Sequence, residues 1–127
     1  MRLLSRPRVA ASIALERDHV RVALPPAARA LALKRDILVP YSTIRESIAT
    51  DAPWPGIFAF RVGTHVPGVV CLGRFWIDGE KRFYAFTKGD RVLTLALDGH
   101  DFDAIVVGAP DADGLASAVR TKLRSTS

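Results

Sequence analysis

Apolar and polar residues alternate in short runs through most of this chain, which is the pattern of β-strands rather than of long helices. The clearest runs are residues 82–87, 91–97 and 102–107. Short turns at 88–90 and 98–100 separate them, and each turn combines glycine with aspartate. Glycine takes the positive φ that a tight turn between antiparallel strands requires. The pattern therefore predicts consecutive antiparallel strands in this third of the chain.

The first half of the chain has weaker strand signals of the same kind. Residues 10–16 and 19–24 carry apolar side chains at period two, and we expect a hairpin around the turn between them. Residues 37–48 predict one bent strand, with Pro40 at an edge or a bulge because proline has no N–H for a ladder. Residues 69–77 predict the fourth main strand, which ends at the next aspartate and glycine.

One amphipathic helix follows the last strand and is the best-supported single element. Asp111 can cap it, and Asp113 complements the positive N-terminal end of the helix dipole. Arg120, Lys122 and Arg124 complement the negative C-terminal end. A single apolar stripe should lie against the sheets, made of Leu115, Ala118, Val119 and Leu123.

These elements together predict a mainly β protein. We expect about seven antiparallel strands in two roughly orthogonal sheets, a barrel or split barrel closed at one end by the C-terminal helix. Leu93, Leu95 and Leu97 give one strand a fully aliphatic face, which should point into the core. Residues 10–124 then form a single domain after a basic N-terminal tail at residues 1–9.

The residues also resemble a known family. Residues 37–44, Ile-Leu-Val-Pro-Tyr-Ser-Thr-Ile, resemble the I-x-x-P-Y-x-x-I segment of bacterial pleckstrin-homology-like domains, which are mostly uncharacterised. Residues 61–64, 67–68 and 73–75 resemble the glycine-marked connection that those domains place before their fourth strand. The similarity continues through residues 82–107, and this agreement of successive short motifs implies the pleckstrin-homology-like fold.

The resemblance implies a binding role rather than a reaction. The bacterial domains tend to look like self-association or protein-interaction modules. Eukaryotic members often bind phosphoinositides through lysines and arginines around the first hairpin. The corresponding turn here contains Glu16 and Asp18 among its cations, and these carboxylates would repel phosphate. The lipid site is therefore not carried over.

Composition and charge narrow the partners only a little. The chain has 127 residues and a formal net charge of +5, with 49% hydrophobic and 24% charged residues, as expected for one folded domain. Cys71 is the single cysteine and lies in an apolar run, so no intrachain disulfide can form. No apolar run approaches the roughly 20 residues that cross a bilayer, so we expect a cytoplasmic protein, with peripheral membrane attachment as the alternative.

Basic residues dominate before residue 36, where Glu16 and Asp18 are the only acids. The basic residues are Arg2, Arg6, Arg8, Arg17, Arg21, Arg29, Lys34 and Arg35. Such a region either attracts an anionic partner, such as a membrane surface, or is a solvated arginine-rich surface.

The sequence offers little for catalysis. Residues 98–103 have the acidic spacing of part of a calcium loop but lack its downstream glutamate, so a hairpin turn with surface aspartates is favoured. No serine, cysteine or histidine lies in the context of a nucleophile, and no phosphate-binding glycine motif is present. We expect no enzyme activity, metal or cofactor, and no small-molecule ligand can be identified. Nucleic-acid binding through the aromatics at 83–86 is disfavoured, because a small β domain needs them in its core.

The best candidate site is the stretch 51–68, whose many prolines and glycines predict a long loop. Long loops carry binding groups on a rigid scaffold. The candidate binding residues are Trp54, Phe58, Arg61 and His65, with Arg74 pointing back toward them. Trp54 could instead cover the open mouth of the barrel. The leading hypothesis is a non-enzymatic module that binds a protein partner or a second copy of itself. The second is a peripheral domain that binds anionic lipid.

Overall fold

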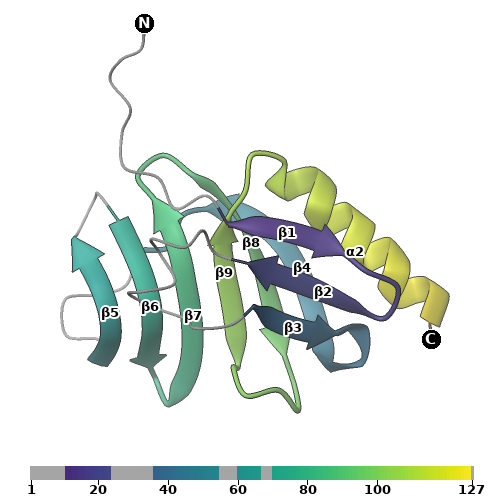
Figure 1. The fold of residues 1–127 in the computed structure, drawn as a ribbon, viewed down its shortest axis with the longest axis horizontal. Coiled ribbons are helices and arrows are strands. Elements are labelled where there is room, and N and C mark those ends of the chain that lie inside the picture. The colour runs from purple at the N-terminus through teal and green to yellow at the C-terminus, as the bar shows by residue number, and fades with distance from the viewer. Residues whose placement is uncertain (1–10, 24–35, 55–59, 67–69, 127) are drawn as a thin grey trace, which may run out of the picture.

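The computed structural model describes residues 11–23, 36–54, 60–66 and 70–126, with residues 60–66, 70 and 126 described by their backbone alone. This part of the chain forms β-strands, one 3-10 turn (η1) and one long helix (α2), shown in Figure 1. The strands are β1 Ser12–Leu15, β2 His19–Ala23, β3 Ile37–Pro40, β4 Ile44–Asp51, β5 Phe60–Val66, β6 Val70–Ile77, β7 Glu80–Thr87, β8 Arg91–Leu97 and β9 Ala104–Gly108. The turn η1 is Tyr41–Thr43, and α2 is Ala112–Thr126. The protein is mainly β, as the sequence predicted.

The strands form two sheets. The small sheet has three strands in the order β1-β2-β3, and the large sheet has six in the order β4-β8-β9-β7-β6-β5. In Figure 1 the small sheet lies in front of the β8 and β4 side of the large sheet, and α2 runs along the same side. Both sheets end in edge strands and neither closes on itself. The arrangement is therefore two open sheets, not the closed barrel that the sequence allowed.

The predicted order of consecutive antiparallel strands is wrong in the large sheet, where β4 pairs with β8 and lies at the opposite edge from β5. β9 lies between β7 and β8, parallel to β7 and antiparallel to β8, so not all pairings are antiparallel. The turn at 88–90 connects β7 to β8 without pairing them, whereas the turn at 98–100 begins the connection of the paired strands β8 and β9. All residues of β9 are buried. A strand without a polar face has to lie inside a sheet, and this explains why β9 separates β7 from β8.

Two further predictions need correction. The bent strand expected at 37–48 is divided by η1 into β3 and β4, which belong to different sheets. Pro40 ends the pairing of β3, and the Tyr41 hydroxyl fixes the turn by donating a hydrogen bond of 2.9 Å to the carbonyl of Glu16. The stretch 51–68 is not one long loop, because it contains β5, which pairs with β6 along its whole length. Gly63 interrupts the sequence signal, yet it stands opposite Gly73 within this ladder.

The turn between β6 and β7 is built as predicted. Asp78 and Gly79 have φ values of 52° and 80°, so both residues are left-handed, as in the two-residue turns that match the twist of a hairpin. Glycine takes this conformation without cost, and aspartate tolerates it better than most residues.

The main core lies between the two sheets, on the side of the large sheet that we call its inner face. Leu93 and Leu95 are fully buried there and Leu97 nearly so, as predicted. The small sheet contributes buried side chains from β2 and β3. Helix α2 packs against β4 and β8 through Ala112, Ala116 and Val119, close to the predicted stripe. In the described part of the chain, α2 is too short and too polar to cross a membrane.

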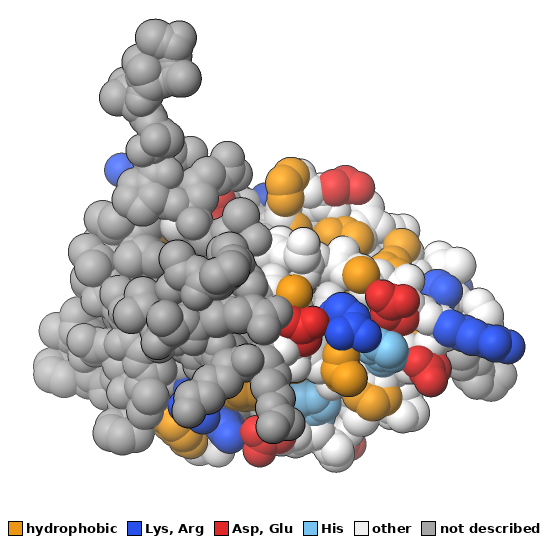
Figure 2. Space-filling model, viewed as in Figure 1, with side chains coloured by type: hydrophobic (Ala, Val, Ile, Leu, Met, Phe, Trp, Pro, Cys, Tyr) orange, Lys and Arg blue, Asp and Glu red, His pale blue; other side chains and the backbone are white. Residues whose placement is uncertain are grey.

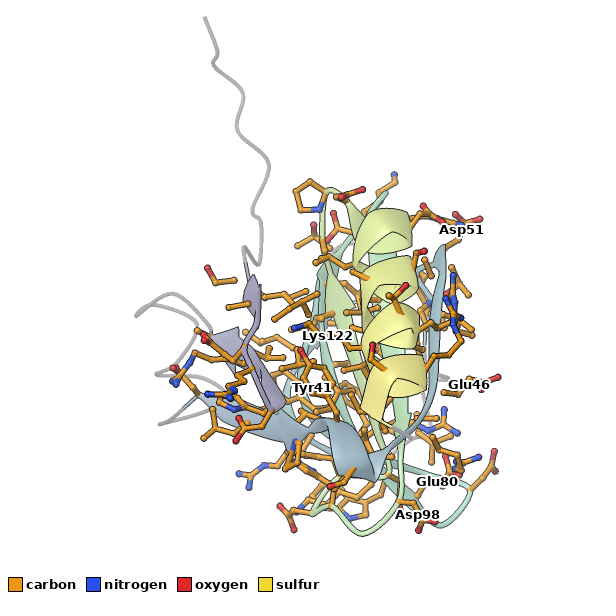
Figure 3. All side chains as sticks on the ribbon, turned by 90° about the vertical axis from the view of Figure 1, so that its right-hand side faces the viewer. Tyr41, Glu46, Asp51, Glu80, Asp98 and Lys122 are labelled. Atoms are coloured by element: carbon orange, nitrogen blue, oxygen red, sulfur yellow. The ribbon has the colours of Figure 1, made fainter. Side chains whose placement is uncertain are left out.

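Side-chain hydrogen bonds fix α2 on β4. Ser47 is buried and its hydroxyl donates to the carbonyl of Ala116 at 3.1 Å, while Arg120 donates to the carbonyl of Ser47 at 2.6 Å. Figure 3 shows Lys122 on α2 beside Tyr41, and its ammonium group lies 5.8 Å from the centre of the Tyr41 ring. Burial raises the pKa of the Tyr41 phenol, and the nearby carboxylates of Glu16 and Asp18 raise it further. Helix α2 thus covers the inner face of the large sheet around Ser47 on β4.

Candidate functional site

The opposite side of the large sheet, its outer face, is not covered by α2 or by the small sheet. Side chains alternate along each strand, so residues next to the core leucines of β8 point to this outer face. Val92 belongs there to a second apolar cluster, which is separate from the main core. The other members of this cluster are Cys71, Phe75, Tyr84, Phe86 and Val106, with Ala52, Trp54 and Ile77 packed against them.

The strand register aligns outer-face residues in rows across four strands. One row runs from Ile48 on β4 through Thr94 and Val106 to Tyr84 on β7. The neighbouring row runs from Glu46 through Ala96 and Ala104 to Arg82. Each row thus has larger side chains on β4 and β7 and mostly smaller ones on β8 and β9. This order of sizes produces a depression along the two middle strands.

The depression is a groove of about 330 Å³. Its lining comes from β4, β7, β8 and β9 and from Pro53, which follows β4. The lining residues are Ile48, Thr50, Pro53, Glu80, Arg82, Tyr84, Thr94, Ala104 and Val106. Ile48 on the rim is 38% exposed. The other large hydrophobic residue that is exposed in the described part of the chain is Leu38, on the small sheet. Val106 and Tyr84 beneath are almost fully buried. The groove therefore presents an apolar surface with a well-packed base.

An ion pair forms the β7 wall of the groove. The Arg82 guanidinium donates to Glu80 Oε1 from Nε at 3.0 Å and from a terminal nitrogen at 2.8 Å. Its other terminal nitrogen donates to the Tyr84 hydroxyl at 3.2 Å. Burial alone would lower the pKa of Arg82, but the bonds to Tyr84 and Glu80 outweigh it and raise that pKa above its ordinary value. Arg82 is therefore a fixed cation whose charge Glu80 balances.

Aromatic packing supports this wall from behind. The rings of Phe75 and Tyr84 stack with their centres 5.1 Å apart, and Trp54 meets Phe86 edge-on at 5.0 Å. Such pairs contribute about 0.5–1.5 kcal/mol beyond the area that they bury. Tyr84 is thus held in place between Phe75 and its bond to Arg82, and the wall is preorganised.

The structure describes only part of the five candidate binding residues. Trp54 is half-buried against Phe86 in the outer-face cluster. Arg61 and His65 are on β5, opposite Phe75 and Cys71, and their side chains lie outside the described residues, as does all of Phe58.

Arg74 lies on β6 between two outer-face residues of that strand, Gly73 and Phe75, so it shares the inner side with Leu72. Its Nε is buried and has no hydrogen-bond partner in the described part of the chain. Trp54 and Arg74 are thus on opposite sides of the sheet. A binding role for the five residues stays a prediction.

The surface of the small sheet is of a different kind. Figure 2 shows acidic, basic, histidine and hydrophobic side chains mixed over this region. Arg21 lies 3.1 Å from the carboxylate of Asp36 and 3.8 Å from that of Glu16. Asp18 bonds His19 Nδ1 at 2.7 Å, and this bond lowers the pKa of the Asp18 carboxyl. Arg17 and Arg21 are the members of the basic N-terminal region that the structure describes, and Arg21 is already paired with acids.

The aspartates of the loop after β8 are used within the protein. The Lys81 ammonium pairs with Asp101 at 3.0 Å, and the Lys81 backbone N–H donates to the Asp103 carboxylate at 2.8 Å. His100 accepts a hydrogen bond from the Phe102 N–H at Nδ1, so its Nε2 carries the proton and donates to the carbonyl of Leu38 at 3.0 Å. The loop thus joins the small sheet to the large one. The described residues contain no cluster of acids, histidines and cysteines that could hold a metal ion.

Comparison of the chain with protein-family models, with curated proteins and with solved structures finds no match. The groove is consequently judged on its own geometry. Sequence reasoning missed it because its opposite walls, at Ile48 and Tyr84, meet only through the pairing of β4 with β8 and of β9 with β7. The local signal was the pair Glu80 and Arg82, which are two residues apart and therefore on one face of a strand.

Proposed function

We propose that this protein is a non-enzymatic binding module whose outer-face groove receives an apolar segment of a partner protein. One observation carries the proposal. The groove is an apolar depression on the one face of the large sheet that neither α2 nor the small sheet covers. A concave surface with an apolar lining and a few placed polar groups is typical of binding sites.

The charges of the lining favour a protein segment over a polyanion. Glu80 and Arg82 are the charged residues of the lining, and they neutralise each other. A membrane surface or a nucleic acid binds mainly through uncompensated cations, and the groove has none to offer. An uncharged apolar segment loses little on leaving water and gains mainly the burial of Ile48.

Two other lines of argument agree with a binding role. The resemblance to bacterial pleckstrin-homology-like domains predicts an interaction module, and it remains a prediction about family. The groove also lacks a paired nucleophile and base, because its titratable groups are the Glu80 and Arg82 pair and the phenol of Tyr84.

Site-specific cross-linking tests the proposal in the cells that make the protein. Ile48→benzoylphenylalanine places a photoreactive ring on the groove rim, and Leu38→benzoylphenylalanine places the same ring on the small sheet as a matched control, since Leu38 is 47% exposed. We expect position 48 to give a discrete protein adduct that position 38 does not give. Adding Thr94→Arg, which fills the groove, should abolish that adduct.

The identity of the adduct decides the class of partner. A second copy of this chain would show self-association, and another protein would show a partner. Equal labelling at positions 48 and 38, or an adduct that survives Thr94→Arg, would contradict the proposal.

A further inference from the structure

The shape and polar groups of the groove also indicate which kind of segment fits it. We propose that the occupant is an amphipathic α-helix of the partner, lying along β8 and β9, with a basic residue directed toward Glu46. This inference rests on the proposed function and adds the conformation and the charge pattern of the bound segment.

A bound segment has to satisfy its own backbone hydrogen bonds. An extended segment brings one N–H and one C=O per residue, and each of these groups has to be paired when it is buried. The groove offers few partners, because the Tyr84 hydroxyl and one Glu80 oxygen already accept from Arg82 and the Thr50 hydroxyl already donates to the Asp51 carbonyl, which leaves mainly the hydroxyl of Thr94. A helix pairs its backbone internally and presents only side chains to the groove. An extended partner would instead add to a sheet edge.

The width of the groove also suits a helix. The walls on β4 and β7 are separated by three strand spacings, which is about 14 Å between backbones. A helix with its side chains is about 10–12 Å across. The small side chains of Ala96 and Ala104 between these walls allow close approach of such a cylinder.

The inner face of the same strands already carries a helix. Helix α2 packs on β4 and β8 through the small residues Ala112 and Ala116 and through Val119. Helices on both faces of one sheet are a common way to bury it. A helix on the outer face would complete the same layering around β8.

A carboxylate near the β4 side of the groove favours a basic residue on the partner. Glu46 stands at the β4 end of the row that leads to Arg82, and Figure 3 shows it projecting from the side of β4 away from α2. Its carboxylate forms no ion pair within the residues that the structure describes, while Glu80 across the groove is already bound to Arg82. Arg45 precedes Glu46 at a bulge of β4 and makes no ion pair with it there. A lysine or arginine on the partner helix would complement Glu46.

Peptide display tests this inference with the whole chain as bait. Two libraries of peptides about 16 residues long have the same composition, because a helix of that length spans about 24 Å, similar to a strand such as β8. One library places its apolar residues at i, i+3, i+4 and i+7, and the other alternates them. We expect binders from the first library, and circular dichroism should show that they become helical when bound.

Variants of the protein then locate the binding. Thr94→Arg should weaken the selected peptides at least about tenfold, whereas Leu38→Glu on the small sheet should leave the affinity unchanged. Glu46→Lys should weaken peptides that carry a base beside it, and a peptide with glutamate at that position should regain affinity for this variant.

The outcomes separate the inference from the function beneath it. Binders from the alternating library that Thr94→Arg disrupts would overturn the helix and leave the groove as a binding site. Helical binders that are indifferent to Glu46→Lys would overturn the charge pattern. Absence of binders that depend on Thr94 would count against both the groove and the helix.

Discussion

The two faces of strand β8 differ in the size of their side chains, although alternate residues of one seven-residue strand form them. Leu93, Leu95 and Leu97 point inward and are buried under α2 and the small sheet. Thr94 and Ala96 point outward, alternate with these leucines, and are only partly buried. The inner face is thus filled with large aliphatic groups, and the outer face has small ones where the groove lies.

This difference indicates that the outer face is not simply the solvent side of a sheet. A face that meets only water usually carries charged and long polar side chains. Here the floor of the groove is made of Ala104, Val106 and Thr94, and the nearest charges are bound to each other. The inner face carries the main core, whereas the outer face combines a smaller buried cluster with the open groove.

The largest test of this comparison removes a side chain from each face. Leu95→Ala should lower the free energy of unfolding by about 2–5 kcal/mol, because Leu95 is fully buried and its loss leaves a cavity. Ile48→Ala on the groove rim should cost less than about 1 kcal/mol, because Ile48 is already 38% exposed. Urea unfolding measures both changes in the free energy of unfolding. The m-value should stay the same in each variant, so that a shifted midpoint reports stability alone.

The pair of results matters more than either value. If Ile48→Ala destabilised the chain as strongly as Leu95→Ala, the rim of the groove would belong to the core and would not be a binding surface. A small effect of both would instead place the core elsewhere than between the two sheets.

Local sequence signals predicted the elements whose cause is local. The inward leucines of β8 and the turn at Asp78 and Gly79 depend on periodicity and on φ, and both are confirmed. The stripe of α2 is confirmed in part: Val119 is buried and Leu115 and Leu123 are partly buried, but the other buried residues are Ala112 and Ala116 and not Ala118. The alternation of β8 needed no knowledge of its neighbours, because it follows from the pleat of the strand itself.

The groove could not be predicted in the same way, since it depends on which strands become neighbours. Local pattern does not reveal that β9 inserts beside β7 or that β4 pairs with β8, and Ile48 meets Thr94 only through that pairing. The glycines and prolines of this region also misled the prediction. Gly63 suggested a loop, but β5 pairs with β6 there and Gly63 stands opposite Gly73. The side chains of Arg61 and His65 lie outside the described residues, so their part in any site stays a prediction.

A second, smaller test compares a hydroxyl group on each face. Ser47→Ala should lower the free energy of unfolding by about 1 kcal/mol, because the buried hydroxyl donates to the carbonyl of Ala116 on α2. Thr94→Val keeps the shape of the side chain on the outer face and should change stability by less than about 0.5 kcal/mol. Its hydroxyl makes no hydrogen bond within the described part of the chain. A marked loss of stability with Thr94→Val would show that the outer face contributes to folding as the inner face does.

The smallest expected effect concerns the exposed edge where α2 meets β8. Arg91 donates to both carboxylate oxygens of Asp113, at 3.0 and 2.9 Å, and this hydrogen bonding lowers the pKa of the Asp113 carboxyl. A carboxyl whose pKa is lowered on folding stabilises the fold above its unfolded pKa of about 3.8 and loses this contribution as the pH falls through the folded value.

Asp113→Asn should therefore lower the midpoint of thermal unfolding slightly at pH 7, and wild type and variant should converge once the pH falls below the folded pKa of Asp113. The difference should also shrink in high salt, because both side chains are exposed and their charges are screened. A large and salt-independent loss at pH 7 would mean that the attachment of α2 depends on this exposed pair. The packing of α2 on the inner face would then contribute less to stability than the burial of Val119 and the hydrogen bond from Ser47 indicate.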